Sequence, residues 1–119
     1  MKVRRGDVVL VDYPYTDRTG SKTRPCLVVQ NDRNNLRLDD TIAVMLTSRT
    51  RFAASEPTQF LIDVSSAEGR QTGLLFDSAF QGENVLTLDC QFIQRKIGVF
   101  SAVLLQQAAT CLKASLDLQ

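Results

Sequence analysis

Three apolar runs rich in β-branched residues stand out in the first half of the chain, and each is followed by polar residues. They lie at residues 8–11, 26–30 and 41–46. Continuous apolar runs of this kind predict strands that are covered on both faces or that close a small barrel. Three more strands are predicted at residues 59–64, 74–80 and 85–88, where apolar stretches lie between turn-forming residues.

Polar segments separate these runs and predict loops at residues 17–22, 31–35 and 65–69. The end of the chain differs, because residues 101–114 carry apolar residues at helical spacing, with Ser101 as a suitable N-cap. A short helical turn is predicted at residues 91–95, before Gly98. The whole pattern predicts one domain over residues 1–119, mainly β with a C-terminal helix, built as a small SH3-like antiparallel β-barrel.

Composition limits where the chain acts and what it binds. No apolar run approaches the roughly 20 residues that a membrane span needs, and the N-terminus has no signal-peptide core. We therefore expect a cytoplasmic protein without a membrane partner. The net charge of +1 does not by itself indicate nucleic-acid binding.

The absence of histidine restricts the possible chemistry. The chain has no His and three widely spaced Cys without a CxxC pair, so a zinc site or any other metal site is not expected. Ser-His-Asp, Cys-His and His-pair nuclease mechanisms are excluded for the same reason. We expect reduced, mostly buried thiols and no cofactor.

Basic residues are concentrated near two predicted strand ends. The first part of the chain carries Lys2, Arg4, Arg5, Arg18, Lys22 and Arg24 against Asp7, Asp12 and Asp17, and Arg49 and Arg51 follow the third run. A local patch of this kind can bind phosphates although the whole molecule is nearly neutral. A solvated surface of mixed charge is an equally good interpretation.

The dipeptide Arg24-Pro25 leads directly into the second apolar run. Pro25 fixes its own φ and disfavours the helical region for the residue before it, so Arg24 enters the strand already extended. Thr47 directly follows the third run, at the expected end of its strand. Taken alone, Arg24 would be a surface arginine and Thr47 a threonine bonded to its own backbone.

Several short motifs in this order and spacing resemble the MazF/PemK family of toxin endoribonucleases over nearly the whole chain. The motifs are Arg5-Gly6-Asp7, Val11-Asp12, Arg24-Pro25, Asn31-Asp32, Leu46-Thr47-Ser48, Thr87-Leu88-Asp89 and Arg95-Lys96-Ile97-Gly98. The resemblance implies a homodimeric toxin of a type II toxin–antitoxin system. Such a toxin cleaves single-stranded RNA (mRNA) and is held inactive by a cognate antitoxin protein.

The resemblance also implies roles for individual residues. Arg24 matches the catalytic arginine and Thr47 the catalytic threonine of the family. RNA supplies its own nucleophile, the 2′-hydroxyl, so cleavage needs proton transfer and stabilisation of a five-coordinate phosphorane, without a metal or a protein nucleophile. The expected products carry 2′,3′-cyclic phosphate or 3′-phosphate and 5′-hydroxyl ends.

Other residues match positions near the RNA groove or belong to the basic patch. The predicted RNA-binding residues are Lys22, Ser48, Arg49, Thr58, Ser78, Glu83 and Asn84. Ordinary polar positions at turns and strand ends are the alternative interpretation. Tyr15 is the candidate for stacking on an unpaired base. The loop before Arg24 departs from the family pattern because it lacks the acidic residue that some members carry there.

Two other functions remain open from the sequence. A CcdB-like toxin with a similar fold would bind and poison DNA gyrase without cleaving RNA, and it would not need Arg24 and Thr47 together. An SH3-like barrel that only binds a peptide should show a groove rich in aromatic residues. The aromatic content is 7% with no Trp, which makes the binding module the weaker alternative.

Overall fold

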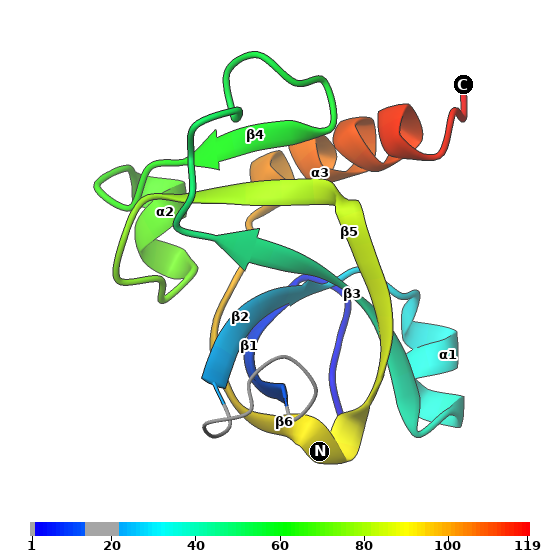
Figure 1. The fold of residues 1–119 in the computed structure, drawn as a ribbon. Helices are drawn as coiled ribbons and strands as arrows, with labels where there is room; N and C mark the ends of the chain where they lie inside the picture. The colour runs from blue at the N-terminus through cyan, green and yellow to red at the C-terminus, as the bar shows by residue number, and fades with distance from the viewer. Residues whose placement is uncertain (1, 14–21) are drawn as a thin grey trace.

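The computed structural model describes residues 2–13 and 22–119, which form one antiparallel sheet and three α-helices (Figure 1). The strands are β1 Asp7–Tyr13, β2 Lys22–Val28, β3 Asp40–Thr47, β4 Gln59–Ile62, β5 Ser78–Asp89 and β6 Ile93–Val99. They pair in the order β4-β5-β3-β2-β1-β6, and every neighbouring pair is antiparallel. The predicted mainly β fold with a C-terminal helix is confirmed. The sheet curls strongly like a barrel, but β4 and β6 are its edges and do not pair with each other.

Two short helices occupy segments that were predicted as loops. α1 covers Asp32–Arg37 and α2 covers Ala67–Gln71. Each begins at a polar N-cap: the Asn31 side chain accepts a hydrogen bond from the backbone N–H of Asn34, and the Ser66 hydroxyl accepts one from Gly69. The same residue types favour both turns and helix N-caps, so a loop and the start of a short helix are hard to distinguish from sequence.

The prediction of separate strands at 74–80 and 85–88 is wrong, because β5 is one long strand. Residues 74–77 precede it as a bend. β5 bends sharply in its middle: Leu46 of β3 faces Phe80, but Val44 faces Val85, so two steps along β3 correspond to five along β5. The residues inside this bulge are polar residues and a glycine, which interrupt the apolar pattern. Their composition is that of a turn, so the sequence predicted two strands separated by a turn.

The predicted helical turn at 91–95 is only partly present. A 3₁₀ turn, η1, covers Cys90–Phe92, and β6 follows directly. β6 is an edge strand that pairs with β1 alone. Its central residues are polar and exposed, so it lacks the apolar run that identified the other strands.

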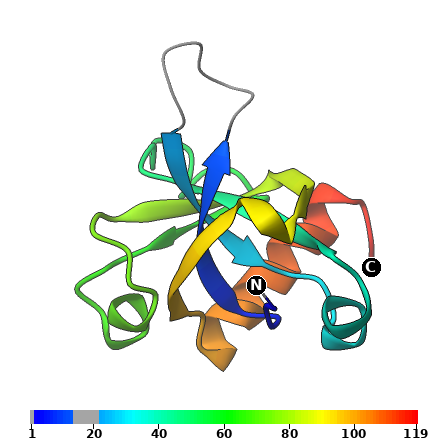
Figure 2. The ribbon, with the colours of Figure 1, turned by 90° about the horizontal axis from the view of Figure 1, so that it is seen from below.

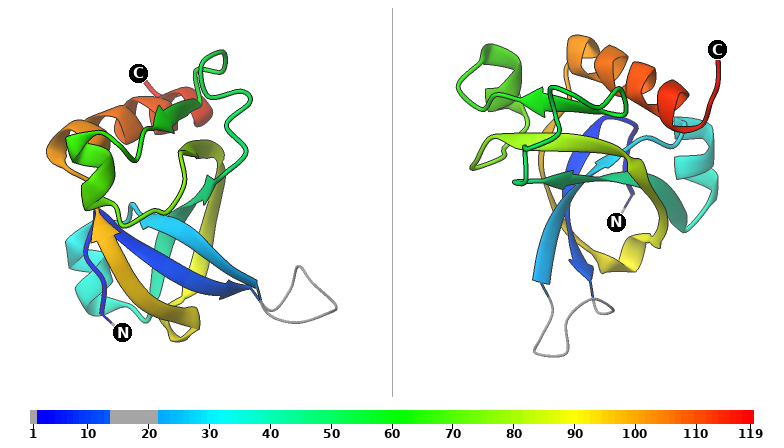
Figure 3. Two further views of the ribbon diagram at one scale, coloured as in Figure 1. Left: turned by 90° about the vertical axis from the view of Figure 1, so that its left-hand side faces the viewer. Right: turned by 45° about the horizontal axis from the view of Figure 1, so that its top comes forward.

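The sheet carries a core on each face. One cluster includes Val8, Leu27 and Phe80 and is covered by α3, Ala102–Ser115, whose Leu104 side chain is buried in it. Figure 3, right, shows α3 lying along β4 and β5. The second cluster, which includes Val11, lies on the other face, inside the curl of the sheet. Among the described residues, no helix is long and apolar enough to cross a membrane.

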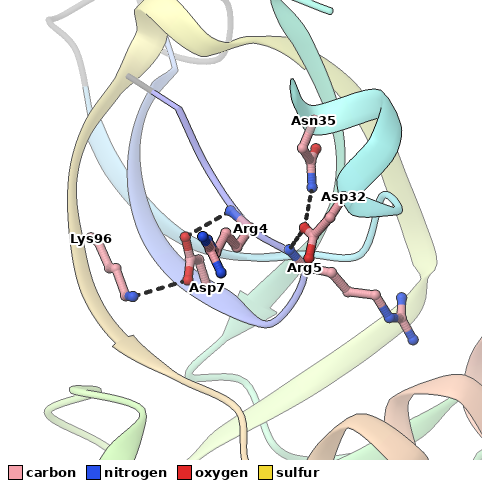
Figure 4. Close-up of polar contacts among 6 residues, drawn as sticks. All are labelled: Arg4, Arg5, Asp7, Asp32, Asn35 and Lys96. Atoms are coloured by element: carbon pink, nitrogen blue, oxygen red, sulfur yellow. Dashed lines mark hydrogen bonds and ion pairs between the residues drawn. The ribbon is translucent and has the colours of Figure 1, made fainter. Parts of the chain in front are cut away.

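The Arg5-Gly6-Asp7 motif fixes the start of β1 to β6 and α1 (Figure 4). The Asp7 carboxylate accepts a hydrogen bond from the backbone N–H of Arg4 at 2.9 Å and pairs with the Lys96 ammonium at 3.1 Å. The backbone N–H of Arg5 donates to the Asp32 carboxylate at 2.7 Å, and this bond is the main reason why the pKa of Asp32 is lowered. We call these five residues the N-terminal clasp. Three of the motifs that carry the family resemblance therefore meet in a structural contact.

Gly6 and Asn35 complete the surroundings of the clasp. Gly6 has φ +98°, a conformation that favours glycine, and its N–H donates to the Val28 carbonyl. The Asn35 amide donates to the Asp32 carboxylate at 3.2 Å and accepts a hydrogen bond from the Thr41 hydroxyl at 2.7 Å. A buried polar side chain whose hydrogen bonds are satisfied fixes its helix in one position, so α1 is held firmly against β3.

Candidate active site

The strands β2 and β3 separate at one end. The candidate catalytic residues lie at this point of separation. Cys26 and Met45 form the last pair between them, although β2 reaches back to Lys22 and β3 continues to Thr47. If the register continued, Arg24 would lie opposite Thr47. Figure 1 shows the two strands parting toward the left. We call the region between their unpaired ends, residues 22–25 of β2 and 46–47 of β3, the opening; Arg24 and Thr47 belong to these two ends.

Arg24 is held by β1 alone. It faces Val11, and Pro25 faces Leu10. Pro25 has no N–H, which is tolerated here because β2 has already left β3. Figure 2 shows this end of β1 and β2 extending beyond the rest of the sheet. The Arg24 side chain is exposed, and in the described part of the chain no hydrogen bond or ion pair engages it. Its guanidinium is thus available to an anion.

Thr47 is half-buried and faces Ala79 of β5. Its hydroxyl oxygen accepts a hydrogen bond from the backbone N–H of Arg49 at 3.1 Å. The hydrogen bond to the neighbouring backbone that the sequence suggested for Thr47 is therefore present. A hydroxyl that accepts one bond still has its own proton to donate. The bond to Arg49 fixes the side chain and leaves the O–H for a ligand.

A pocket of about 520 Å³ lies beside these two residues, between the β2–β1–β6 layer and the segment that joins α2 to β5. Figure 3, left, looks onto this side, with β6, β1 and β2 below α2. Among the described residues, the pocket is lined mainly by apolar side chains, together with three hydroxyls and one cation. The polar lining residues are Thr23, Ser48, Ser78 and Arg95. Arg24 and Thr47 do not line the pocket themselves, but their sequence neighbours Thr23, Pro25 and Ser48 do. Because side chains alternate along a strand, the pocket lies on the face of β2 opposite to the one from which Arg24 projects.

The predicted RNA-binding residues therefore form two groups. Lys22, Ser48, Arg49 and Ser78 lie near the opening, at the beginning of β2, the end of β3 and the beginning of β5. Thr58, Glu83 and Asn84 lie near the bulge of β5 and the start of β4. Ser78 and Glu83 are five residues apart in one strand, or on the order of 15 Å. Within one chain the structure does not bring the two groups together.

The second group is a hydrogen-bonded cluster around Glu83. The Thr58 hydroxyl donates to Glu83 Oε1 at 2.9 Å, and the Gln59 amide donates to Oε2 at 2.5 Å. Burial works against the charged carboxylate, but hydrogen bonds from its own backbone N–H, Gln59 and Thr58 outweigh it and lower the pKa of Glu83. Asn84 donates separately to Gln81 at 2.8 Å. The sequence pattern gave no indication of Gln59.

The basic residues near the N-terminus serve the fold. The Lys2 ammonium donates to the backbone carbonyl of Leu36 at 2.9 Å, near the end of α1. The Arg5 guanidinium donates to the Val29 carbonyl at 2.6 Å. Only part of the basic patch that the sequence indicated is therefore directed toward the opening. Tyr15, the predicted stacking residue, lies outside the described residues.

Residues 2–13 and 22–119 contain no group of three His, Cys, Asp or Glu side chains that could hold a metal ion. The side chains at the opening are a guanidinium and hydroxyls, which donate hydrogen bonds and stabilise negative charge. The arrangement suits a phosphate.

Comparison with known proteins identifies the family. A sequence model described as "PemK-like, MazF-like toxin of type II toxin-antitoxin system" matches residues 4–116. The chain belongs to this family. It is 32% identical over 120 residues to a curated Mycobacterium tuberculosis (strain ATCC 25618 / H37Rv) protein named Endoribonuclease MazF9, and the match covers 98% of each chain.

Solved structures show the same fold. An endoribonuclease from a mycobacterial species, in complex with its cognate antitoxin, superposes with a TM-score of 0.78 at 23% identity, covering 98% of this chain and 97% of that one. A MazE–MazF crystal structure from Deinococcus radiodurans gives a TM-score of 0.76 at 18% identity, with full coverage of both chains. The predicted family is confirmed, and the predicted class, a toxin endoribonuclease, agrees with the name of the curated relative.

Proposed function

We propose that residues 1–119 form one toxin domain that cleaves single-stranded RNA without a metal ion, with Arg24 and Thr47 as its catalytic residues. One observation carries this assignment. Both residues lie two positions beyond the last pair between β2 and β3, on opposite sides of the same opening. The family match and the name of the curated relative support the activity.

The chemistry follows from the groups at the opening. The 2′-hydroxyl attacks the adjacent phosphorus, the P–O5′ bond breaks, and a 2′,3′-cyclic phosphate and a 5′-hydroxyl result. The Arg24 guanidinium presents a planar fork of donors that stabilises the extra negative charge on the phosphorane oxygens. It also assists proton transfer to the leaving 5′-oxygen. The Thr47 hydroxyl donates to the same phosphate and fixes its position.

The remaining polar residues bind the RNA away from the reacting atoms. Lys22, Ser48, Arg49 and Ser78 contact nucleotides next to the cut, because they lie around the opening. Thr58, Glu83 and Asn84 contact nucleotides farther along the strand. A segment of several nucleotides is needed to reach both groups, which agrees with a sequence-selective enzyme.

We further propose that the active form is a homodimer. Several large apolar side chains away from the pocket remain exposed, namely Leu61, Val103, Leu116 and Leu118, and such exposure often marks an interaction surface. A two-fold dimer would let one RNA strand follow a continuous groove past two equivalent sites. Sedimentation at micromolar concentration tests this proposal, and a monomer would contradict it.

The proposed inhibitor is a cognate antitoxin, since one solved structure of similar fold is described as an endoribonuclease in complex with its cognate antitoxin and another as a MazE–MazF structure. An acidic, partly disordered segment would complement the basic residues around the opening and order on binding. The toxin and its mRNA substrate would meet in the cytoplasm.

The direct test is to incubate the purified protein with a long RNA in EDTA and to map the new ends. Cleavage with 5′-hydroxyl ends supports the proposal. Activity that EDTA abolishes and magnesium restores contradicts it. Toxicity in cells without RNA cleavage would instead favour a CcdB-like toxin.

A further inference from the structure

Arg95 lies in a row of residues that leads to the catalytic opening. In the sheet, Leu10 faces Pro25 of β2 on one side and Arg95 of β6 on the other. Adjacent strands are about 4.8 Å apart, so the Cα atoms of Arg95 and Pro25 lie roughly 10 Å apart. Arg24 immediately precedes Pro25. Because side chains alternate along a strand, Arg95 and Pro25 point to one face of the sheet and Arg24 projects from the other. The two faces meet where β2 parts from β3, so Arg95 stands on the approach to the opening and not directly opposite the proposed catalytic arginine.

The neighbouring basic residues Arg95 and Lys96 have different surroundings. The Lys96 ammonium is paired with the nearly buried Asp7 carboxylate at 3.1 Å. The Arg95 side chain is exposed, and in the described part of the chain no hydrogen bond or ion pair engages it. It lines the 520 Å³ pocket, and no carboxylate among the described residues lines that pocket with it. The positive charge of the Arg95 guanidinium is therefore available to bind an anionic ligand.

The rest of the pocket provides an apolar surface and hydroxyl groups. Leu75 and Phe76 are 84% and 71% exposed, which is unusual for side chains of this size unless they meet a partner. The Ser78 hydroxyl donates to the Phe76 carbonyl at 2.9 Å and helps to fix this segment. Ser48 lies on the same lining, directly after Thr47. Unpaired bases bind to surfaces of this kind, with a ring face for stacking and polar groups for the edge.

We propose that Arg95 is a substrate-positioning residue that binds a backbone phosphate of the nucleotide flanking the cut, while the base of that nucleotide lies against Leu75 and Phe76. This inference rests on the proposed cleavage of RNA and deepens it. Arg95 does not touch the reacting atoms, so its contribution is to binding. The pocket volume lies within the usual range for ligand sites, about 300–1,000 Å³.

The first test measures RNA binding without cleavage. A fluorescent RNA is titrated into Arg24→Ala protein, with and without the additional change Arg95→Ala, at several salt concentrations. Loss of one phosphate contact should weaken binding several-fold and reduce the slope of log Kd against log salt by about 0.7, the value for single strands. Arg33→Ala, on the exposed side of α1, is the matched control and should change neither quantity.

The second test separates positioning from catalysis in protein with Arg24 intact. Arg95→Ala should raise KM several-fold with kcat nearly unchanged, and Arg95→Lys should recover part of the loss because it keeps the charge. On an RNA that lacks the base at the flanking position, Phe76→Ala should raise KM much less than it does on intact RNA. Arg95→Ala should raise KM as much on this abasic RNA as on intact RNA. Thermal unfolding checks that each variant is folded.

The outcomes are distinguishable. A KM and a salt slope equal to those of Arg33→Ala would overturn the role of Arg95. A fall in kcat comparable to that of Arg24→Ala would also overturn it, because Arg95 would then act on the reacting atoms. If the wild-type protein binds RNA through Arg95 but never cleaves it, the proposed function fails and the binding site stands.

Discussion

Cys26 and Met45 form the last pair of the ladder between β2 and β3, and the proposed catalytic residues follow two positions beyond it on each strand. A ladder that stops early leaves two strand ends beside each other without joining them. Arg24 is paired with β1 and Thr47 with β5, and neither is paired with the other's strand. In the proposed complex, a phosphate between these strand ends would meet groups from both strands.

Replacing Arg24 tests the stabilisation of charge. Arg24→Ala should lower kcat about 10²–10³-fold, which is the usual loss when one preorganised donor at a developing charge is removed. The fold should persist because the side chain is exposed. Arg24→Lys should recover only part of the rate, since an ammonium keeps the charge but not the planar fork. Single-turnover cleavage measures all three proteins, and an unchanged rate for Arg24→Ala would exclude the catalytic role.

Replacing Thr47 tests the hydroxyl. Thr47→Val removes both the proton offered to the phosphate and the acceptor for the Arg49 N–H. Thr47→Ser keeps both groups and serves as the control. We expect Thr47→Val to lower kcat at least tenfold and Thr47→Ser to keep most of the activity. Equal activity in the two variants would show that the hydroxyl has no part in cleavage.

The N-terminal clasp predicts a change in stability alone. Asp7→Ala removes the partner of Lys96 and the acceptor for the Arg4 N–H. Because Asp7 is nearly buried, its loss should lower the free energy of unfolding by about 1–3 kcal/mol. Urea unfolding measures this difference, with Asp39→Ala as an exposed control. The kcat of the folded variant should be unchanged, since the clasp lies away from the opening.

The hydrogen bonds to Glu83 predict a dependence on pH. Its pKa is lowered in the folded state, so its contribution to stability is present above the unfolded pKa and is lost as the pH falls through the folded pKa. Glu83→Gln should therefore lower stability by about 1 kcal/mol or less at pH 7, because the carboxylate is exposed. The difference should shrink below about pH 4. Glu56→Gln is the control, and a difference that stays constant with pH would contradict the assignment.

The sequence predicted the parts of the fold that rest on strong periodicity. The runs that became β1, β2 and β3 are continuous and apolar, and the stripe on α3 is helical, so their positions followed directly. β6 was missed because an edge strand with polar residues such as Arg95 has no apolar pattern. The continuity of β5 was missed because its bulge looks like a turn, and only its pairing with β3 shows otherwise.

The candidate site was predictable only in part, for a similar reason. Arg24 and Thr47 were identified from the family resemblance, because each is unremarkable in isolation. Where they lie depends on the point at which β2 and β3 separate, which no local pattern encodes. The pocket depends on contacts between segments distant in the chain. Phe76 and Arg95 become neighbours of Ser48 only when the sheet curls.

The central claim is that the RNA's own 2′-hydroxyl attacks the phosphate, assisted by Arg24 and Thr47. The most direct measurement uses an RNA with one mapped cleavage site and a matched strand with a single 2′-deoxy nucleotide immediately 5′ of that bond, both in EDTA. We predict that the all-RNA strand is cut to 2′,3′-cyclic phosphate and 5′-hydroxyl ends. The substituted strand should bind equally well and remain intact at that bond. Cleavage of the 2′-deoxy strand at the same bond would contradict the account.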